Sequence, residues 1–238
     1  MARHALLNNI EHKDLRVITR HGSEFGDNMM CVPVFPVEFR LAQACYPLLF
    51  VRDANGEFQV VALLGLAQDE NLFIENGLWD ALYKPLMVEK GPFLIGRGHA
   101  DSEQETLSIH VDLDDPRLST EEGQPIFLAH GGNSDYIENV ASILSTIHQS
   151  QGETAEFVAA LSELALIESF ALDYGSKSGQ SHRLSGYCTI SEDKLKQLNA
   201  AQLAELHQKG YLEPIYMLIA SMSHLSSLIQ RQQRRNHE

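Results

Sequence analysis

The chain has 238 residues, of which 44% are hydrophobic, 21% charged and 8% aromatic. This composition is typical of globular proteins and excludes the disordered and fibrous classes. Lys and Arg total 18 and Asp and Glu total 32, which gives a net charge of −14. Because a field of this sign repels phosphate backbones, we expect no nucleic-acid partner.

The cysteines and the N-terminus indicate a reducing compartment. Cys31, Cys45 and Cys188 are odd in number and contain no C-x-x-C pair, which argues against a disulfide framework or a zinc site. The N-terminal segment has only a short apolar run, Ala5–Leu7, before two asparagines, so no signal peptide is predicted. No window approaches the ~20 apolar residues of a membrane span. We therefore expect a cytoplasmic protein without membrane insertion.

Two hairpins are predicted in the first half of the chain. The clearer one spans residues 46–65, where apolar runs flank Asp53-Ala-Asn-Gly56, because Asn and Gly tolerate the positive φ of tight hairpin turns. The second joins residues 92–95 to residues 106–112. A short helix is predicted over residues 78–87, with Pro85 limiting its length.

Helical patterns dominate after Gly131-Gly132. A helix capped by Asn133 or Ser134 is predicted to end near Gly152, and a second is predicted over residues 154–170. A short strand follows over residues 184–190. Helices are then predicted over residues 194–198, 201–208 and 214–234, the first of them starting at Ser191 with two acids behind it.

This order of elements predicts an α+β fold, in which an N-terminal antiparallel, hairpin-built sheet packs with C-terminal helices. We expect one domain over residues 1–238, β-rich from about 15 to 128 and mainly helical from about 133 to 235.

A candidate metal site lies on the second predicted hairpin. His110 and Asp112 are two residues apart on a strand, which places both side chains on one face. With a distant histidine, such as His182 or His130, they would form the 2-His-1-carboxylate set that binds Fe(II). The simpler interpretation, which we favour, is a histidine and an aspartate at the end of a strand.

The chain between residues 99 and 122 is strongly acidic. It holds eight acids against one base, Arg117. Asp112, Asp114 and Asp115 before Pro116 would suit a divalent cation, but the glycine and terminal glutamate of a calcium loop are missing. A solvated, aspartate-rich turn is the favoured interpretation.

A candidate ligand site lies between the two predicted hairpins. The only tryptophan, Trp79, follows Asn71 and precedes Tyr83. With Phe93, these residues could line a pocket in which aromatic walls supply area and Asn71 directs orientation. The alternative is that the aromatic side chains only fill the core.

A series of motifs spread over nearly the whole chain, in a fixed order, resembles the SapC family of bacterial proteins. The motifs are Val32-Pro-Val34 with Glu38-Phe39, Tyr46-Pro47 with Phe50, Leu64-Gly-Leu66, Glu70-Asn-Leu-Phe73, Gly77 and Trp79 with Tyr83 and Pro85, Pro92-Phe93, Val111-Asp112, Gly123 with Pro125-Ile-Phe127, Leu184-Ser-Gly-Tyr187 before Glu192 and Leu195, and then Leu206, Gly210, Ile215-Tyr216, Ser221 and Leu225.

The resemblance implies companions rather than a reaction. The family takes its name from a surface-layer locus, and its members look like companions of cupin-type oxygenases, flavin halogenases and outer-membrane receptors. It assigns no catalytic residue. We therefore expect a non-enzymatic accessory or binding protein with a protein partner, such as a cupin-type oxygenase or flavin halogenase system, or a surface-layer or transport system. We expect no cofactor, and a homo-oligomer is compatible with the sequence. The alternative is a non-haem iron oxygenase using His110 and Asp112.

Overall fold

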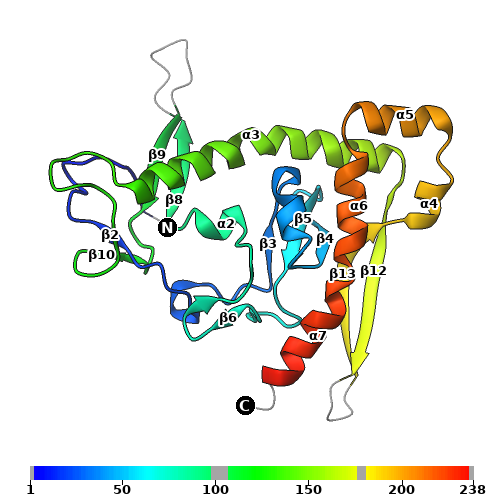
Figure 1. The fold of residues 1–238 in the computed structure, drawn as a ribbon, viewed down its shortest axis with the longest axis horizontal. Helices are drawn as coiled ribbons and strands as arrows, with labels where there is room; N and C mark the ends of the chain where they lie inside the picture. The colour runs from blue at the N-terminus through cyan, green and yellow to red at the C-terminus, as the bar shows by residue number, and fades with distance from the viewer. Residues whose placement is uncertain (1–2, 98–106, 176–180, 236–238) are drawn as a thin grey trace. The chain divides into compact units, whose positions relative to one another are not determined.

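The computed structural model describes residues 3–97, 107–175 and 181–235, which divide into two compact units (Figure 1). Unit 1 contains residues 1–27, 76–78 and 86–149, and unit 2 contains residues 28–75, 79–85 and 150–238. The helix α3 (Asp135–Glu163) contributes its residues up to Gln149 to unit 1 and the rest to unit 2. The fold is α+β with antiparallel sheets, as the order of elements predicts.

Unit 1 contains two small antiparallel sheets. In the first, β9 (Leu107–Asp112) lies between β1 (His4–Leu6) and β8 (Phe93–Arg97). The pairing of β8 with β9 confirms the second predicted hairpin. In the other sheet, β2 (Arg16–Val17) lies between β10 (Leu118–Ser119) and β11 (Gln124–Pro125). The short helices of this unit are the 3-10 turn η1 (Ser23–Phe25) and α2 (Leu86–Glu89).

The core of unit 1 is formed by the inner faces of these strands and the first half of α3. Ser134 begins α3 as expected, since its hydroxyl accepts a hydrogen bond from the Ile137 amide at 3.4 Å. The apolar spacing of the helix then directs one stripe inward. The buried core residues are Val17, Phe93, Val111, Ile126, Phe127, Ile137, Val140 and Leu144.

A buried charged group, here called the Asp27 network, fixes the chain after β2. The Asp27 carboxylate accepts hydrogen bonds from Arg117 at 2.5 Å and from the Gly22 amide at 3.0 Å, and it contacts the His21 ring nitrogen at 3.0 Å. Arg117 also donates to the carbonyl oxygen of Arg20 at 2.8 Å. Asp27 and Arg117 are only 3% and 7% exposed, so the pair is screened little by water.

Unit 2 is built on a five-stranded sheet with the order β12-β13-β4-β5-β3. Its strands are β3 (Cys31–Pro33), β4 (Leu48–Arg52), β5 (Phe58–Leu63), β12 (Ile167–Gly175) and β13 (Ser181–Ile190). The β4–β5 pairing confirms the first predicted hairpin. Gly56 in its turn has φ +83°, a conformation that glycine adopts without steric cost.

The helices of unit 2 are the 3-10 turn η2 (Pro36–Glu38), α1 (Phe39–Ala42), α4 (Glu192–Lys196), α5 (Ala200–Gln208), α6 (Leu212–Ser221) and α7 (His224–Arg235). Of these, α6 packs on β4 and β13 of the sheet, and α1 packs on α6. The buried Ser221 hydroxyl accepts a hydrogen bond from the Leu48 amide at 2.9 Å, which joins α6 to β4. Asn199 and Gln202 form a capping box at the start of α5.

Residues 154–163 are helical as predicted, but the break near Gly152 and the helix end at residue 170 are wrong. Instead, α3 continues through Gly152 to Glu163, and β12 begins at Ile167. A single exposed glycine costs a helix only about 1 kcal/mol, which is too little to end it. Ala165, with φ +53°, reverses the chain, and pairing of residues 167–175 with β13 overrides their helical pattern. The second half therefore contains a long hairpin, in which the strand predicted over residues 184–190 is confirmed and the helix predicted up to residue 170 is not.

Two further helix boundaries differ from the prediction. The final helix is divided into α6 and α7 at Met222 and Ser223, where the Ser223 hydroxyl donates to the Ala220 carbonyl and competes with the helical pattern. The helix expected over residues 78–87 is restricted to α2, which follows Pro85, while β6 (Ile74–Glu75) and β7 (Leu78–Trp79) form a two-stranded hairpin. None of the helices in the described ranges has the length and apolarity to cross a membrane.

Candidate ligand-binding site

Two arginines of α7 bind the chain that follows β5. Arg231 donates to the Asp80 carboxylate at 2.5 Å and to the Asp80 carbonyl at 3.2 Å. Arg235 donates to the carbonyl oxygens of Asn71 and Ile74 at 2.7 and 2.8 Å. These contacts, here called the α7 clamp, give hydrogen-bond partners to carbonyl groups in a stretch with little regular structure. The clamp therefore fixes the position of residues that border a cavity.

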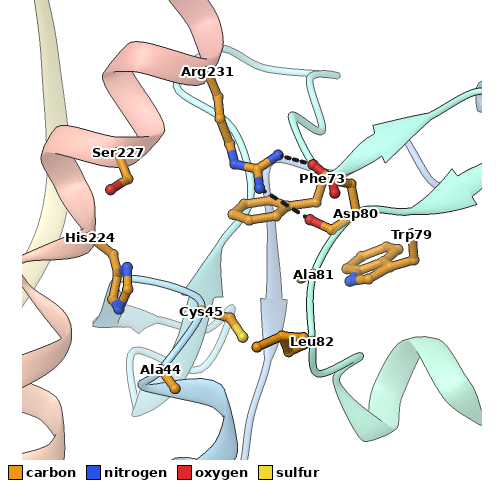
Figure 2. Close-up of a pocket in the computed structure, with 10 residues that line it drawn as sticks. All are labelled: Ala44, Cys45, Phe73, Trp79, Asp80, Ala81, Leu82, His224, Ser227 and Arg231. Atoms are coloured by element: carbon orange, nitrogen blue, oxygen red, sulfur yellow. Dashed lines mark hydrogen bonds and ion pairs between the residues drawn. The ribbon is translucent and has the colours of Figure 1, made fainter.

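The cavity has a volume of about 490 Å³ and lies beside α7 (Figure 2). One wall carries the polar side chains of α7, and the facing wall carries apolar and aromatic side chains of residues 79–82 (Figure 2). Its volume lies in the range of small-molecule sites, and it is open to solvent on the side of Leu82, which is fully exposed. The lining residues are Ala44, Cys45, Phe73, Trp79, Asp80, Ala81, Leu82, His224, Ser227 and Arg231.

A chain of hydrogen bonds holds the aromatic wall in place. The Trp79 indole N–H donates to the Tyr46 hydroxyl at 2.7 Å, and the Tyr46 hydroxyl donates to the Tyr83 carbonyl. The Tyr83 hydroxyl in turn donates to the Glu38 carboxylate at 2.6 Å. Burial raises the pKa of Tyr46 well above its usual value, so its hydroxyl stays protonated and remains a donor. The indole orientation is thus set before any ligand enters.

Arg231 connects the polar and aromatic parts of the lining. Its guanidinium carbon lies 4.5 Å from the centre of the Phe73 ring, within the range of a cation–π contact. The Phe73 ring packs edge-on against Tyr46, with 4.7 Å between ring centres. The Asp80 carboxylate balances the arginine charge, and both side chains are partly exposed. The cavity therefore offers hydrogen-bond donors and acceptors more than net charge.

The structure brings together three of the four residues proposed as ligand-binding. Trp79 lines the cavity, and Tyr83 supports it through Tyr46. Asn71 is buried, and its side-chain oxygen accepts from the Phe73 amide at 2.9 Å while its carbonyl is bound by the clamp. Phe93 belongs to the core of unit 1 and is not a lining residue.

The residues proposed for metal binding are divided between the units. His110 and Asp112 share one face of β9 in unit 1, whereas His182 lies on β13 in unit 2 and stacks on Tyr174. The His110 ring covers Gly96, since a Cβ there would fall 2.2 Å from the imidazole. Within the described ranges, no three His, Cys, Asp or Glu side chains group closely enough to hold a metal ion. The iron site stays a prediction.

Residues 98–106 of the acidic segment lie outside the described residues. In the described part, the aspartates accept hydrogen bonds from nearby backbone amides. Asp112 accepts from Asp114 at 3.1 Å and Asp115 accepts from Arg117 at 2.8 Å. This is the hydrogen bonding of an aspartate-rich turn, which the sequence favours.

The lining residues of α7 were not predicted from the sequence. His224, Ser227 and Arg231 have the spacing i, i+3, i+7, which places them on one helix face. That polar spacing was the available signal, but in the sequence the basic end of the helix is explained equally well by the helix dipole. Nothing in the sequence around Cys45 indicates that it lines a cavity.

Comparison with protein-family models gives a match to the SapC model over residues 7–228. The chain belongs to the SapC family. The match extends over both units and ends at residue 228, before the two arginines of the α7 clamp. Every residue that lines the cavity except Arg231 lies within it. No curated protein matches the chain, and no solved structure matches it.

Proposed function

We propose that this member of the SapC family is a non-enzymatic binding protein whose ligand occupies the cavity beside α7. The observation that supports this most is the cavity itself, in which a polar helix face opposes an aromatic wall and both walls are already fixed by hydrogen bonds. Preformed sites of this kind bind without paying a large ordering cost.

The lining favours a small amphipathic ligand. Phe73, Trp79 and Leu82 supply apolar area, and the Leu82 side chain is fully exposed at 101%, so it gains most from being covered. His224 and Arg231 on the facing wall would orient a polar group of the ligand. An aromatic molecule with one hydrogen-bonding or anionic substituent fits both walls.

The binding role would serve a partner. The family resemblance favours a modifying enzyme, such as a cupin-type oxygenase or a flavin halogenase system, or a surface-layer or transport system. Three unpaired cysteines and the acidic composition support a cytoplasmic setting without a nucleic-acid partner. In this proposal the SapC protein binds a small molecule that the partner modifies or transports.

Trp79 is the only tryptophan, so its emission reports on the cavity alone. We propose a titration with 8-anilinonaphthalene-1-sulfonate, an aromatic anion that fluoresces in apolar sites. We expect saturable binding with quenching of the Trp79 emission. Ala44→Phe, which fills the lining, should weaken binding by about tenfold, equivalent to 1.4 kcal/mol. Ala201→Phe, on the exposed side of α5, is the matched control and should leave binding unchanged.

Binding of the dye with equal affinity to the Ala44→Phe variant, or without quenching of Trp79, would show that the cavity is not the site. Melting curves of both variants establish that each is folded, so that loss of binding is not loss of structure.

One observation keeps the iron enzyme as a second candidate. His110 and Asp112 share a face of β9, and the His4 ring nitrogen lies 3.9 Å from the Asp112 carboxylate across the strand pair. Metal analysis of protein purified without chelator separates the candidates. We expect no stoichiometric iron, and the same low content in His110→Ala. Stoichiometric iron that is lost in the variant would favour the enzyme.

A further inference from the structure

Unit 2 exposes further apolar side chains that do not line the cavity beside α7. Val37, Leu41 and Tyr216 are exposed by 58%, 57% and 57%. Val37 and Leu41 are four residues apart along η2 and α1, and α1 packs on α6, which carries Tyr216. An ion pair between Arg40 and Glu213 joins the two helices beside these side chains. We call this surface the α6 face.

A second cavity of unit 2, of about 280 Å³, is lined in part by sequence neighbours of residues in the α6 face. Pro36, next to Val37, and Pro214, two residues before Tyr216, both line it. Its floor is aromatic, because the buried Phe157 ring packs edge-on against Tyr211 with 5.3 Å between ring centres. Exposed apolar side chains are typical of protein interaction sites, in which a pocket often receives one side chain of the partner.

The charge of this cavity is negative. Glu153 and Glu156 line it and are three residues apart on α3, so their carboxylates repel each other on one helix face. The cationic Lys209 also lines it, but its amine is paired with Glu205 at 2.7 Å. Among the described residues, neither Glu153 nor Glu156 has a cation within 4.0 Å. A cation entering the cavity would relieve this repulsion.

We propose that the α6 face binds a segment of a partner protein that inserts an arginine into this cavity and places apolar residues on Val37, Leu41 and Tyr216. The inference rests on the proposed accessory function, for which it names the chemistry of the partner. The guanidinium would pair with Glu153 and Glu156 and stack on Tyr211, while the flanking apolar side chains cover area that is now exposed to water.

The negative charge of the cavity and of the whole chain favours a basic segment over the other possible occupants. A phosphate group or an anionic lipid surface is repelled by both glutamates and by the net charge of −14. A second copy of the chain is equally acidic, so its approach is opposed at long range. A basic, apolar segment of a different protein is attracted and also fits the apolar part of the surface.

The test uses two fluorescein-labelled peptides in which one residue is flanked by leucines. That residue is arginine in the first peptide and citrulline, its neutral isostere, in the second. Fluorescence anisotropy should show the arginine peptide binding about tenfold more tightly to the full-length protein. The double substitution Glu153→Gln with Glu156→Gln should remove this preference, whereas Glu168→Gln, an exposed glutamate on β12, should retain it. Tyr216→Ala should weaken both peptides alike.

Equal affinity for the two peptides, or an unchanged preference in the glutamine variant, would overturn the proposal. So would the absence of saturable binding up to about 1 mM. Dimerisation of the protein that Tyr216→Ala abolishes, without peptide binding, would identify the occupant as a second copy and also overturn it. Each variant is checked by its melting curve. Dye binding at the α7 cavity is measured in the same samples, so that failure here is distinguished from failure of the proposed function.

Discussion

Unit 1 and unit 2 each use arginine to fix an irregular stretch of chain, but in opposite surroundings. In the Asp27 network, Arg117 and its carboxylate partner are almost fully buried. In the α7 clamp, the side chains of Arg231 and Asp80 are 31% and 49% exposed. Water screens the second pair and not the first. Loss of one partner should therefore destabilise the protein more at the buried pair, whereas the exposed pair borders a cavity and can contact a ligand.

The largest effect is expected from Asp27→Asn. The substitution leaves the Arg117 charge buried without its carboxylate, and breaking such a pair costs about 3–5 kcal/mol. Urea unfolding followed by circular dichroism measures the loss. Asp14→Asn, at an exposed carboxylate that faces Lys13 at 3.9 Å, is the matched control and should change stability by less than about 0.5 kcal/mol. Equal effects of the two variants would contradict the importance of burial.

The Asp27 network also predicts a dependence on pH. The pKa of Asp27 is lowered from its ordinary value of 3.8, because hydrogen bonds from His21 and Arg117 to the carboxylate outweigh the opposing effect of burial. The folded state then binds the proton less tightly than the unfolded state, so the contribution is present above pH ~4 and is lost as the pH falls through the lower folded value.

The stability difference between the wild-type protein and Asp27→Asn should accordingly shrink as the pH is lowered from about 5 to about 2. Urea titrations at several pH values measure this difference. A difference that stayed constant over that range would mean that Asp27 has the same pKa in the folded and unfolded states.

An intermediate effect is expected from Tyr46→Phe in unit 2. The variant removes the acceptor of the Trp79 indole and the donor to the Tyr83 carbonyl, which should cost about 1–2 kcal/mol. Because Trp79 is the only tryptophan, its emission spectrum should shift at the same time. Tyr216→Phe, which alters an exposed hydroxyl, is the control for both measurements. An unchanged Trp79 spectrum in Tyr46→Phe would indicate that the hydrogen bonds do not orient the indole.

The smallest effect on stability is expected from Arg231→Ala. Exposed ion pairs contribute about 1 kcal/mol or less, and the Phe73 ring keeps its edge-on contact with Tyr46. The affinity for the dye in the cavity should nevertheless fall, because Arg231 lines it. Arg183→Ala removes a still more exposed pair with Asp173, in which both side chains are 63% exposed, and should leave dye binding unchanged. A stability loss as large as that of Asp27→Asn would remove the contrast between the two units.

Local patterns in the sequence predicted the elements whose hydrogen bonds are also local. The β4–β5 hairpin follows from a turn of residues 53–56, and α5 begins at a capping box of neighbouring residues. The end of the helix predicted over residues 154–170 is wrong because the hydrogen bonds that decide it are not local. Its apolar spacing fits a helix, but residues 167–175 pair with β13, and those cross-strand bonds outweigh a local preference.

Only part of the candidate site could be predicted, again because contacts between residues distant in sequence leave no local pattern. The sequence predicts Trp79 and Tyr83 as site residues, because large aromatic residues near polar ones suggest a pocket. Both contribute to the site. The opposite wall comes from α7, about 150 residues further along the chain, and no local pattern connects Arg231 with Asp80. Phe93 has the same residue type as Phe73, yet only packing places one in a core and the other beside a cavity.

The sequence by itself determined the family, the α+β class, the hairpins and the acidic character, because these follow from composition, order of motifs and contacts between near neighbours. Only the tertiary structure decided which arginine is buried and which borders a cavity, and which aromatic side chains meet. Those outcomes depend on contacts between residues distant in sequence, whose energies are set by burial and mutual geometry rather than by residue type.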